Sequence, residues 1–281
     1  MRLGQLKWNG VTTAAIFDHV SARPIPDYTL AELIARAEKE GESLPELANG
    51  LASRHPVTAK PIIPLYPKEV WAAGSTYQDT AEKRDTALAA GKTFHMNAHR
   101  ASRPEIVFKG TSRICVGPDQ SIGIRPDSSF TAPAAEIAIV LGVNGRIVGY
   151  MLANDVTAQD LESENPLYTA QAKTFSGSCA LGPYLVTTDE ISDPHMLEIT
   201  CQIERGGREI FRGRATTANL GRKLDSLVEY LIRGNPVPPG SLLLTGTGIM
   251  VDREAALAHG DSVTIQAPQL GELRNTAARL Q

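Results

Sequence analysis

The sequence predicts an α+β fold with a β-rich core and a small N-terminal unit. From Glu69 onward, short apolar runs of strand length alternate with glycine, proline and aspartate. Only two segments in this part, 77–92 and 219–234, have helical character. The chain has 281 residues, of which 42% are hydrophobic and 21% charged, which is typical of a globular protein. That length suits one large domain and one small one.

The first 65 residues are predicted to form the small α+β domain, and 66–281 the large one. Strand-like pieces broken by glycine and proline precede a clear helix. Thr29 and Glu32 make a capping box at its start, and Gly41 is a plausible stop. The apolar stripe of this helix is Leu30, Leu33, Ile34 and Ala37. Four prolines in 55–67 predict an extended connector to the large domain.

The large domain is predicted to contain at least ten strands. Their sequences are EVWAAG, EIVFKG, RICVG, SIGIRP, EIAIVLG, RIVGYMLAND, GPYLVTTDE, EITCQIERGG, SLLLTGTG and SVTIQAP. The first helical segment, 77–92, has few large apolar residues, so we expect it to pack weakly and act as a mobile flap. The second is predicted to be capped by Asn219 and ended by Gly234. Its apolar face is Leu220, Leu224, Leu227, Val228 and Leu231.

Composition excludes several classes of function. The net charge is −3 and no run of Lys or Arg is present, so nucleic acid is not an expected partner. No apolar run has the length of a membrane span, and the first ten residues lack the apolar core of a secretion signal. The three cysteines form no CxxC pair, which argues against a disulfide framework or a zinc ribbon. We therefore expect a soluble cytoplasmic protein.

Two acids in apolar strands are the first candidates for chemistry. Glu136 lies in a run that is otherwise apolar, and Asp155 follows another. The intervening VNGR predicts a hairpin turn, which brings both carboxylates to one end of the sheet. Carboxylate oxygens and water suit Mg²⁺ or Mn²⁺. Spacing alone leaves an alternative open, in which Glu136 pairs with an arginine and Asp155 caps a turn.

His95 and His99 stand four residues apart, which is the ligand spacing on a helix. The glutamate of a zinc-binding HExxH motif is absent. We therefore interpret them as surface histidines rather than as a zinc site.

A family resemblance sharpens this picture. The segments VWAAGSTYQD, RPEIVFKG, PAAEIAIVLG, GYMLANDVTAQDLE, AKTFSGSCALGPYLVT and LLLTGTG resemble, in order, the fumarylacetoacetate hydrolase family over about 69–275. The stretch ESENPLYTAQAKTFSGSCALGP is most similar to its branch of 2-keto-3-deoxy-sugar-acid dehydratases. The resemblance implies a mixed β-roll core and a homodimer or higher homo-oligomer. It also implies a divalent ion, Mg²⁺ or Mn²⁺, held by three carboxylates against a 2-oxo acid.

Carried over by position, Glu136 and Asp155 match two of those metal ligands. The first glutamate of the family's ExE motif falls on Ala134, which cannot bind a metal. Water can fill the gap, so weaker metal binding is expected. Family hydrolases also carry a His–Glu pair that activates water, and here Thr80 and Lys83 stand at those positions. This difference argues against C–C hydrolysis and favours dehydration.

Two residues match the catalytic groups of this branch. Lys173 matches the active-site lysine, which acts either as a base or by stabilising an enolate. Glu105 is the candidate acid–base partner, and its alternative is an ion pair with Arg103.

Four further matches concern substrate binding. Lys109 either secures structure or binds an anionic substrate, and Glu162 is a candidate to hold a substrate hydroxyl. Tyr77 and the main chain around Thr247 are candidate substrate contacts. Gln159 stands where relatives often have arginine, so recognition of the substrate carboxylate is not expected at this position.

These observations predict a lyase of sugar-acid metabolism. The expected reaction dehydrates a 2-keto-3-deoxy pentonate to a dioxo acid semialdehyde through an enolate. The expected partner is this small 2-oxo acid. Two alternatives stay open: a C–C hydrolase or decarboxylase of a small oxo acid, and an inactive relative, impaired in metal binding, that only binds an oxo acid.

Overall fold

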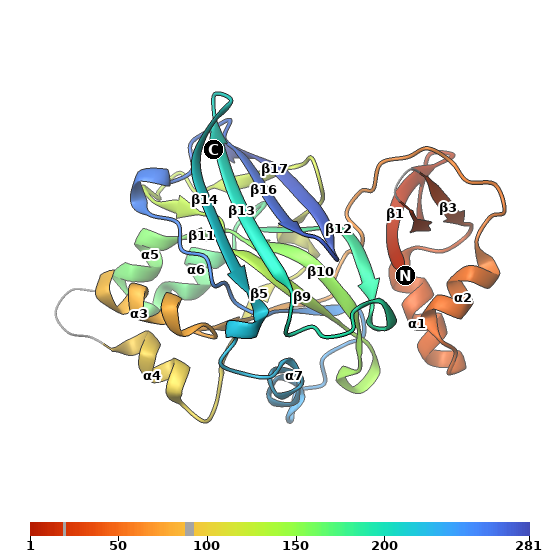
Figure 1. The fold of residues 1–281 in the computed structure, drawn as a ribbon, viewed down its shortest axis with the longest axis horizontal. Helices are drawn as coiled ribbons and strands as arrows, with labels where there is room; N and C mark the ends of the chain where they lie inside the picture. Colours follow the sequence, from red (N-terminus) through yellow and green to blue (C-terminus); the bar gives the residue numbers. More distant parts are fainter. Residues whose placement is uncertain (19–20, 88–92) are drawn as a thin grey trace.

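The chain folds around two β-sheets, with helices at both ends of the larger one (Figure 1). The structure is a computed structural model that describes residues 1–18, 21–87 and 93–281. The larger sheet runs in the order β3 (Ala22–Ile25), β2 (Val11–Phe17), β1 (Arg2–Trp8), β12 (Cys179–Thr187), β10 (Ile147–Asp155), β9 (Ala135–Leu141), β15 (Ser241–Leu244), β4 (Val70–Gly74) and β5 (Glu105–Gly110), and β6 (Cys115–Val116) pairs with β12.

The second sheet packs against β9, β10 and β12. Its order is β14 (Arg208–Thr216), β13 (Glu198–Arg205), β16 (Ser262–Ala267), β17 (Gly271–Arg279) and β7 (Ser121–Ile124). A short pair is formed by β8 (Thr131–Ala132) and β11 (Thr157–Ala158). The helices are α1 (Leu30–Glu40), α2 (Leu44–Leu51), α3 (Gln78–Ala87), α4 (Phe94–Arg100), α5 (Gln159–Glu164), α6 (Thr169–Lys173) and α7 (Leu224–Ile232). This β-rich architecture confirms the predicted fold class.

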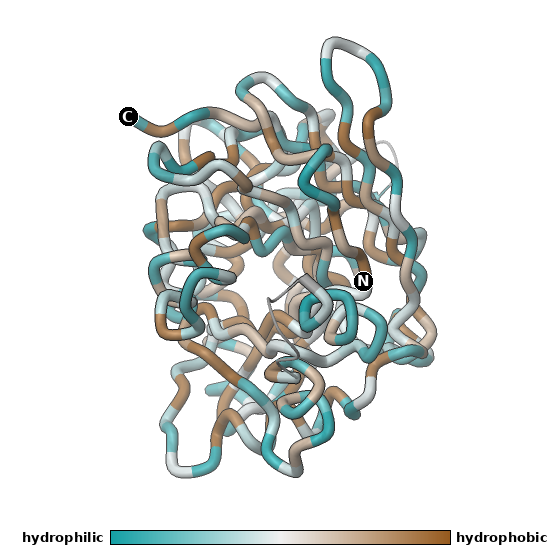
Figure 2. Tube along the Cα trace, turned by 90° about the vertical axis from the view of Figure 1, so that its left-hand side faces the viewer, coloured by the Kyte–Doolittle hydropathy of each residue, from teal (hydrophilic) through white to brown (hydrophobic). Residues whose placement is uncertain are grey.

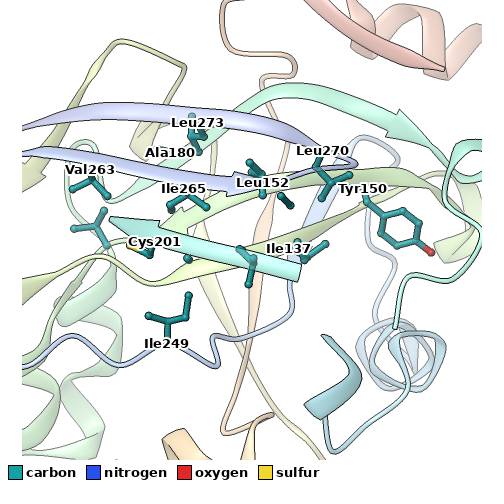
Figure 3. Packing of buried hydrophobic residues seen from close by; sticks show 14 of the residues in the cluster. Ile137, Tyr150, Leu152, Ala180, Cys201, Ile249, Val263, Ile265, Leu270 and Leu273 are labelled. Carbon is teal, nitrogen blue, oxygen red and sulfur yellow. The ribbon is translucent and has the colours of Figure 1, made fainter. Parts of the chain in front are cut away.

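The main core lies between the two sheets. Figure 3 shows Ile137 and Leu152 of the larger sheet facing Ile265 and Leu273 of the second one, and all four are buried. The hydrophobic segments lie mainly inside the molecule, and many turns at its edge are hydrophilic (Figure 2). A second apolar cluster covers the opposite face of the larger sheet, beneath α1 and α2. Because side chains alternate along a strand, each residue of β9 belongs to one of these two faces.

All ten strand-like segments named from sequence contain a strand, but the long strands β14 and β17 were missed, as were the two-residue strands β8 and β11. β14 carries three arginines and a glutamate and is largely exposed, so its apolar pattern is weak. It forms because it pairs along its length with β13. β17 exposes alternate polar side chains and buries Leu273 and Ala277, with Asn275 between them. Pairing to neighbours, rather than β propensity, stabilises both strands.

The helix predicted for 219–234 is shorter than expected. It begins at Leu224, and Leu220 lies outside it. Gly221 donates its N–H to the carbonyl of Thr76, and Leu220 pairs with Tyr77, so tertiary contacts hold this segment outside the helix. The other four apolar residues of the predicted stripe are buried. In the first domain, α1 has the predicted capping box, and Gly41 ends it with φ +69°.

The boundary near residue 65 stays a prediction. Strands β1 to β3 extend the larger sheet, since Leu3 of β1 pairs with Leu185 of β12. In Figure 1 these strands lie with α1 and α2 at one end, away from α3 to α6. The predicted flap forms α3 as far as Ala87, and 88–92 lie outside the described residues. None of the described helices combines the length and the apolar character that crossing a membrane requires.

Candidate active site

The β9–β10 hairpin brings the two candidate metal ligands to one end of the larger sheet. Its turn contains Asn144 and Gly145, both with positive φ, as the VNGR sequence predicted. Glu136 pairs with Ala153, and the N–H of Asp155 donates to the carbonyl of Ala134 at 2.9 Å. Residues 153 and 155 share one face of β10, so the two carboxylates are diagonal neighbours on that face.

Asp155 is held between two lysines. Its Oδ1 lies 2.5 Å from Lys109 Nζ, and its Oδ2 accepts a hydrogen bond from Lys173 Nζ at 2.9 Å. Burial by itself raises the pKa of Asp155, but the two ammonium groups outweigh burial and lower that pKa to about 2. Asp155 is therefore a carboxylate anion, and it caps no turn.

Glu136 lacks such compensation. Its Oε2 accepts the N–H of Gly246 at 2.7 Å, and no ion pair to it occurs among the described residues. Burial, followed by the charge of Asp155, raises the pKa of Glu136 to about 8. Gly246 has φ +86°, and a Cβ there would collide with the Thr76 hydroxyl, so this close approach requires glycine.

Lys173 lies at the centre of the site, at the end of α6. Its Nζ donates to Asp155 and to Thr157 Oγ1 at 2.8 Å, and lies 3.6 Å from Glu162. Burial lowers the pKa of Lys173, but Asp155 and Glu162 outweigh it, so the pKa is raised above its ordinary value. Lys173 is thus an ammonium, which suits stabilisation of an enolate and opposes the role of a base.

Glu105 is held through a serine rather than by Arg103. Ser75 Oγ donates to Glu105 Oε2 at 3.0 Å and lies 3.3 Å from His95 Nδ1. Arg103 instead stacks on the ring of Tyr230. Glu105 pairs with Gly74 on the neighbouring strand, where any side chain would collide with the Glu105 carboxylate. The carboxylate therefore lies across the glycine and reaches the pocket.

The pocket brings together five of the eight predicted site residues. Asp155, Glu105, Glu162, Lys173 and Thr247 line it. Its volume, ≈ 30 Å³, is room for about two water molecules.

The other three predicted residues lie behind the pocket wall or beside it. Lys109 is 1% exposed, and its Nζ donates to the carbonyl of Lys173 at 2.7 Å, so it secures structure. Glu136 lies behind Gly246, which lines the pocket. Tyr77 lines a neighbouring hollow with Gly248, and burial followed by the charge of Glu136 raises its pKa.

Sequence reasoning missed three residues at this site. Arg84 and Ser75 line the pocket, and His95 contacts Ser75. His95 was interpreted as a surface histidine, but it is half-buried, and His99 Nδ1 contacts the carbonyl of Ser75 at 2.9 Å. One signal was present in the sequence of 77–92, which has few large apolar residues and carries Arg84.

Comparison with known proteins identifies the family of this chain. The family model described as fumarylacetoacetate hydrolase, C-terminal, matches 69–278. The chain belongs to the fumarylacetoacetate hydrolase family. This result confirms the resemblance noted from the strand and loop motifs.

Two relatives and one structure show where in the family the similarity lies. The chain is 44% identical over 213 residues, 75% of this chain and 72% of the other, to 2-dehydro-3-deoxy-D-arabinonate dehydratase of Saccharolobus solfataricus. It is 39% identical over 214 residues, 76% and 73% of the two chains, to a probable 2-keto-3-deoxyxylonate dehydratase of Haloferax volcanii. A solved 2-keto-3-deoxy-D-arabinonate dehydratase, complexed with magnesium and 2,5-dioxopentanoate, superposes with a TM-score of 0.86 at 34% identity over 100% of both chains.

Proposed function

We propose that this protein is a dehydratase that converts a 2-keto-3-deoxy pentonate to a dioxo acid semialdehyde. The observation that carries the proposal is the pocket in which the Lys173 ammonium, Glu105 and Glu162 converge beside Asp155. The similarity to two sugar-acid dehydratases over three quarters of the chain supports the same reaction. Thr80 supports it too, because its hydroxyl donates to the main-chain oxygens of Tyr77 and Thr247 and cannot replace the histidine of a water-activating pair.

The protonation states suggest an order of events. Because Lys173 is an ammonium, Glu105 is the better candidate to take the proton from C3 of the substrate. The C3–H electron pair forms the C2–C3 double bond, and Lys173 stabilises the negative charge on the C2 oxygen. When the C2 carbonyl re-forms, the electron pair of the C2–C3 double bond forms the C3–C4 double bond, and the C4–O bond breaks. The hydroxyl takes the proton held by Glu105 and leaves as water, and the unsaturated product rearranges to the aldehyde.

The residues fit a divalent cation, with two carboxylates rather than three. Glu136 is a buried acid without an ion-pair partner, and a cation would supply the missing positive charge. Among the described residues no group of three His, Cys, Asp or Glu side chains is arranged to hold a metal, consistent with Ala134 in place of a ligand. We propose that Glu136 and Asp155 hold Mg²⁺, or Mn²⁺ in its place. Such an ion, when bound, polarises the 2-oxo group and acidifies the C3 proton.

The test of the reaction is an assay with 2-keto-3-deoxy pentonates of defined configuration in the presence of Mg²⁺. We expect a semialdehyde product and a loss of about 10²- to 10⁴-fold in kcat for Glu105→Gln, because a general base is removed. Glu164→Gln is the matched control, since Glu164 is an exposed acid of α5. Binding of the acids without turnover would refute the dehydratase and favour a protein that only binds oxo acids.

Restoring the missing carboxylate tests the metal site separately. Ala134→Glu is expected to raise the affinity for Mg²⁺ by about tenfold or more, because ligand charge sets affinity for hard cations. Ala134→Gln is the control, since it adds similar bulk without charge. Titration calorimetry with Mg²⁺ and with Mn²⁺ measures the effect. Equal affinities in all three proteins would place the metal elsewhere.

A homodimer or larger homo-oligomer, implied by the resemblance, stays a prediction. Analytical ultracentrifugation of the full chain checks it, and a monomer at micromolar concentration would contradict it.

A further inference from the structure

Arg84 is a cation in the pocket wall whose donors are unused. It comes from α3, lines the pocket, and its side chain is 15% exposed. Its Nε is buried without a hydrogen-bond partner, and Arg84 makes no hydrogen bond within the described part of the chain. A guanidinium has five N–H donors, and leaving a buried donor unpaired is costly. An arrangement of this kind is explained if a bound molecule supplies the acceptor.

The charge of Arg84 is only partly compensated. Its nearest acid is Glu162, with Nη1 and Oε2 3.8 Å apart, which is too far for a hydrogen bond. Glu162 is also 3.6 Å from Lys173, so one carboxylate lies between two cations. Burial raises the pKa of Glu162, but Lys173 and Arg84 outweigh it and lower that pKa.

The other cation lining the pocket is already engaged. Lys173 donates to Asp155 and Thr157. Among the described lining residues, Arg84 is therefore the cation with free donors. Its planar fork matches the two oxygens of a carboxylate, which a lysine ammonium does not.

We propose that Arg84 binds the carboxylate of the 2-oxo acid substrate. The inference rests on the substrate class of the proposed function and assigns the recognition of its charged end, for which Gln159 offers no cation. Arg84 thus acts as a specificity-determining residue that selects acids over uncharged oxo compounds. Because Arg84 lies on α3, a substrate bound to Arg84 also contacts this helix.

The test compares pyruvate with methyl pyruvate, an uncharged ester of the same shape, by calorimetry on the Mg²⁺-loaded full chain. In Arg84→Gln we expect affinity for pyruvate to fall about 10- to 100-fold, because a hydrogen-bonded charge pair is lost. Binding of the ester should change little, and Arg84→Lys should lie between. Lys83→Gln is the matched control, an exposed cation beside Arg84 on the same helix. The thermal midpoint of each variant checks that it is folded.

Three outcomes would overturn the assignment: pyruvate affinity unchanged in Arg84→Gln, equal losses for pyruvate and its ester, or no preference for pyruvate in the wild type. Because pyruvate binding needs no dehydration, this test gives a result for Arg84 even if the protein does not catalyse the proposed reaction. If the protein prefers pyruvate through Arg84 but forms no semialdehyde, the role assigned to Arg84 stands and the proposed dehydration is refuted. If turnover occurs, Arg84→Gln should raise KM more than it lowers kcat.

Discussion

The pocket has two walls of different character. The strand wall carries Asp155, with Lys109 of β5 and Glu136 of β9 behind it, and each of these side chains is almost wholly buried. The helical wall is α3 with α4 beside it. Arg84 of α3 lines the pocket, His95 of α4 contacts the lining residue Ser75, and both are partly exposed. In the strand wall, burial and neighbouring charges set the protonation state of each group. In the helical wall, Arg84 keeps N–H donors free. The comparison suggests that one wall holds a fixed charge framework and the other receives the substrate.

Packing explains the difference. Every residue of β9 is buried, and the strand pairs on both sides. Between Gln78 and Thr86, α3 buries only Thr80 and Ala81, and α4 buries Met96. Because few apolar contacts are lost when such helices separate from a sheet, we expect local opening of α3 and α4 at lower free energy than global unfolding.

The largest effect should follow from Lys109→Met in the strand wall. The change leaves Asp155 with one cation in place of two, and the carbonyl of Lys173 loses one donor while keeping that of Ser178 Oγ. Breaking a buried ion pair costs about 3–5 kcal/mol of unfolding free energy. Urea denaturation measures it, with Lys60→Met as the control because Lys60 is exposed. A loss below about 1 kcal/mol would show that the framework is not structural.

A smaller and local effect is expected from Asp85→Ala in the helical wall. Asp85 accepts the N–H groups of His95 and Met96, each at 2.8 Å, and so joins α3 to the first turn of α4. Removing this cap should cost about 1 kcal/mol, seen as roughly fivefold faster hydrogen exchange in 95–100. Asp79→Ala is the control on the same helix. An equal loss of global stability would show that the two walls unfold together.

The smallest effect concerns pH. The pKa of His95 is lowered by burial first and by Arg84 next, against the opposing charges of Glu162, Glu105 and Asp85. When α4 is packed in place, the His95 imidazole is therefore neutral. When α4 is open, the same imidazole binds a proton near pH 6.5. Docking of α4 should be fully stable above that pH and weaken as pH falls below it. Hydrogen exchange between pH 5 and 7.5 measures this change, and His95→Gln should flatten it. A profile unchanged in the variant would assign the pH dependence to another group.

Local patterns predicted much of the strand wall. The apolar run that contains Glu136 and the turn signal at Asn144 and Gly145 were enough to bring Glu136 and Asp155 to one end of the sheet. The family motifs added Lys173, Glu105 and Glu162, and all three line the pocket. What the motifs did not predict is that two lysines share Asp155, because Lys109 and Lys173 approach it from β5 and α6.

By itself the sequence determined ten strands of the large domain, the hairpin and the capped helix α1, because periodicity, turns and caps depend on neighbouring residues. Only the tertiary structure decided which charges meet. Lys109 lies behind the pocket and Arg84 in its wall, although both are cations near predicted elements. Asp155 and Glu162 keep Lys173 an ammonium against the effect of burial, whereas burial and the charge of Asp155 raise the pKa of Glu136. These energies depend on distances through space, which separation along the chain does not reveal.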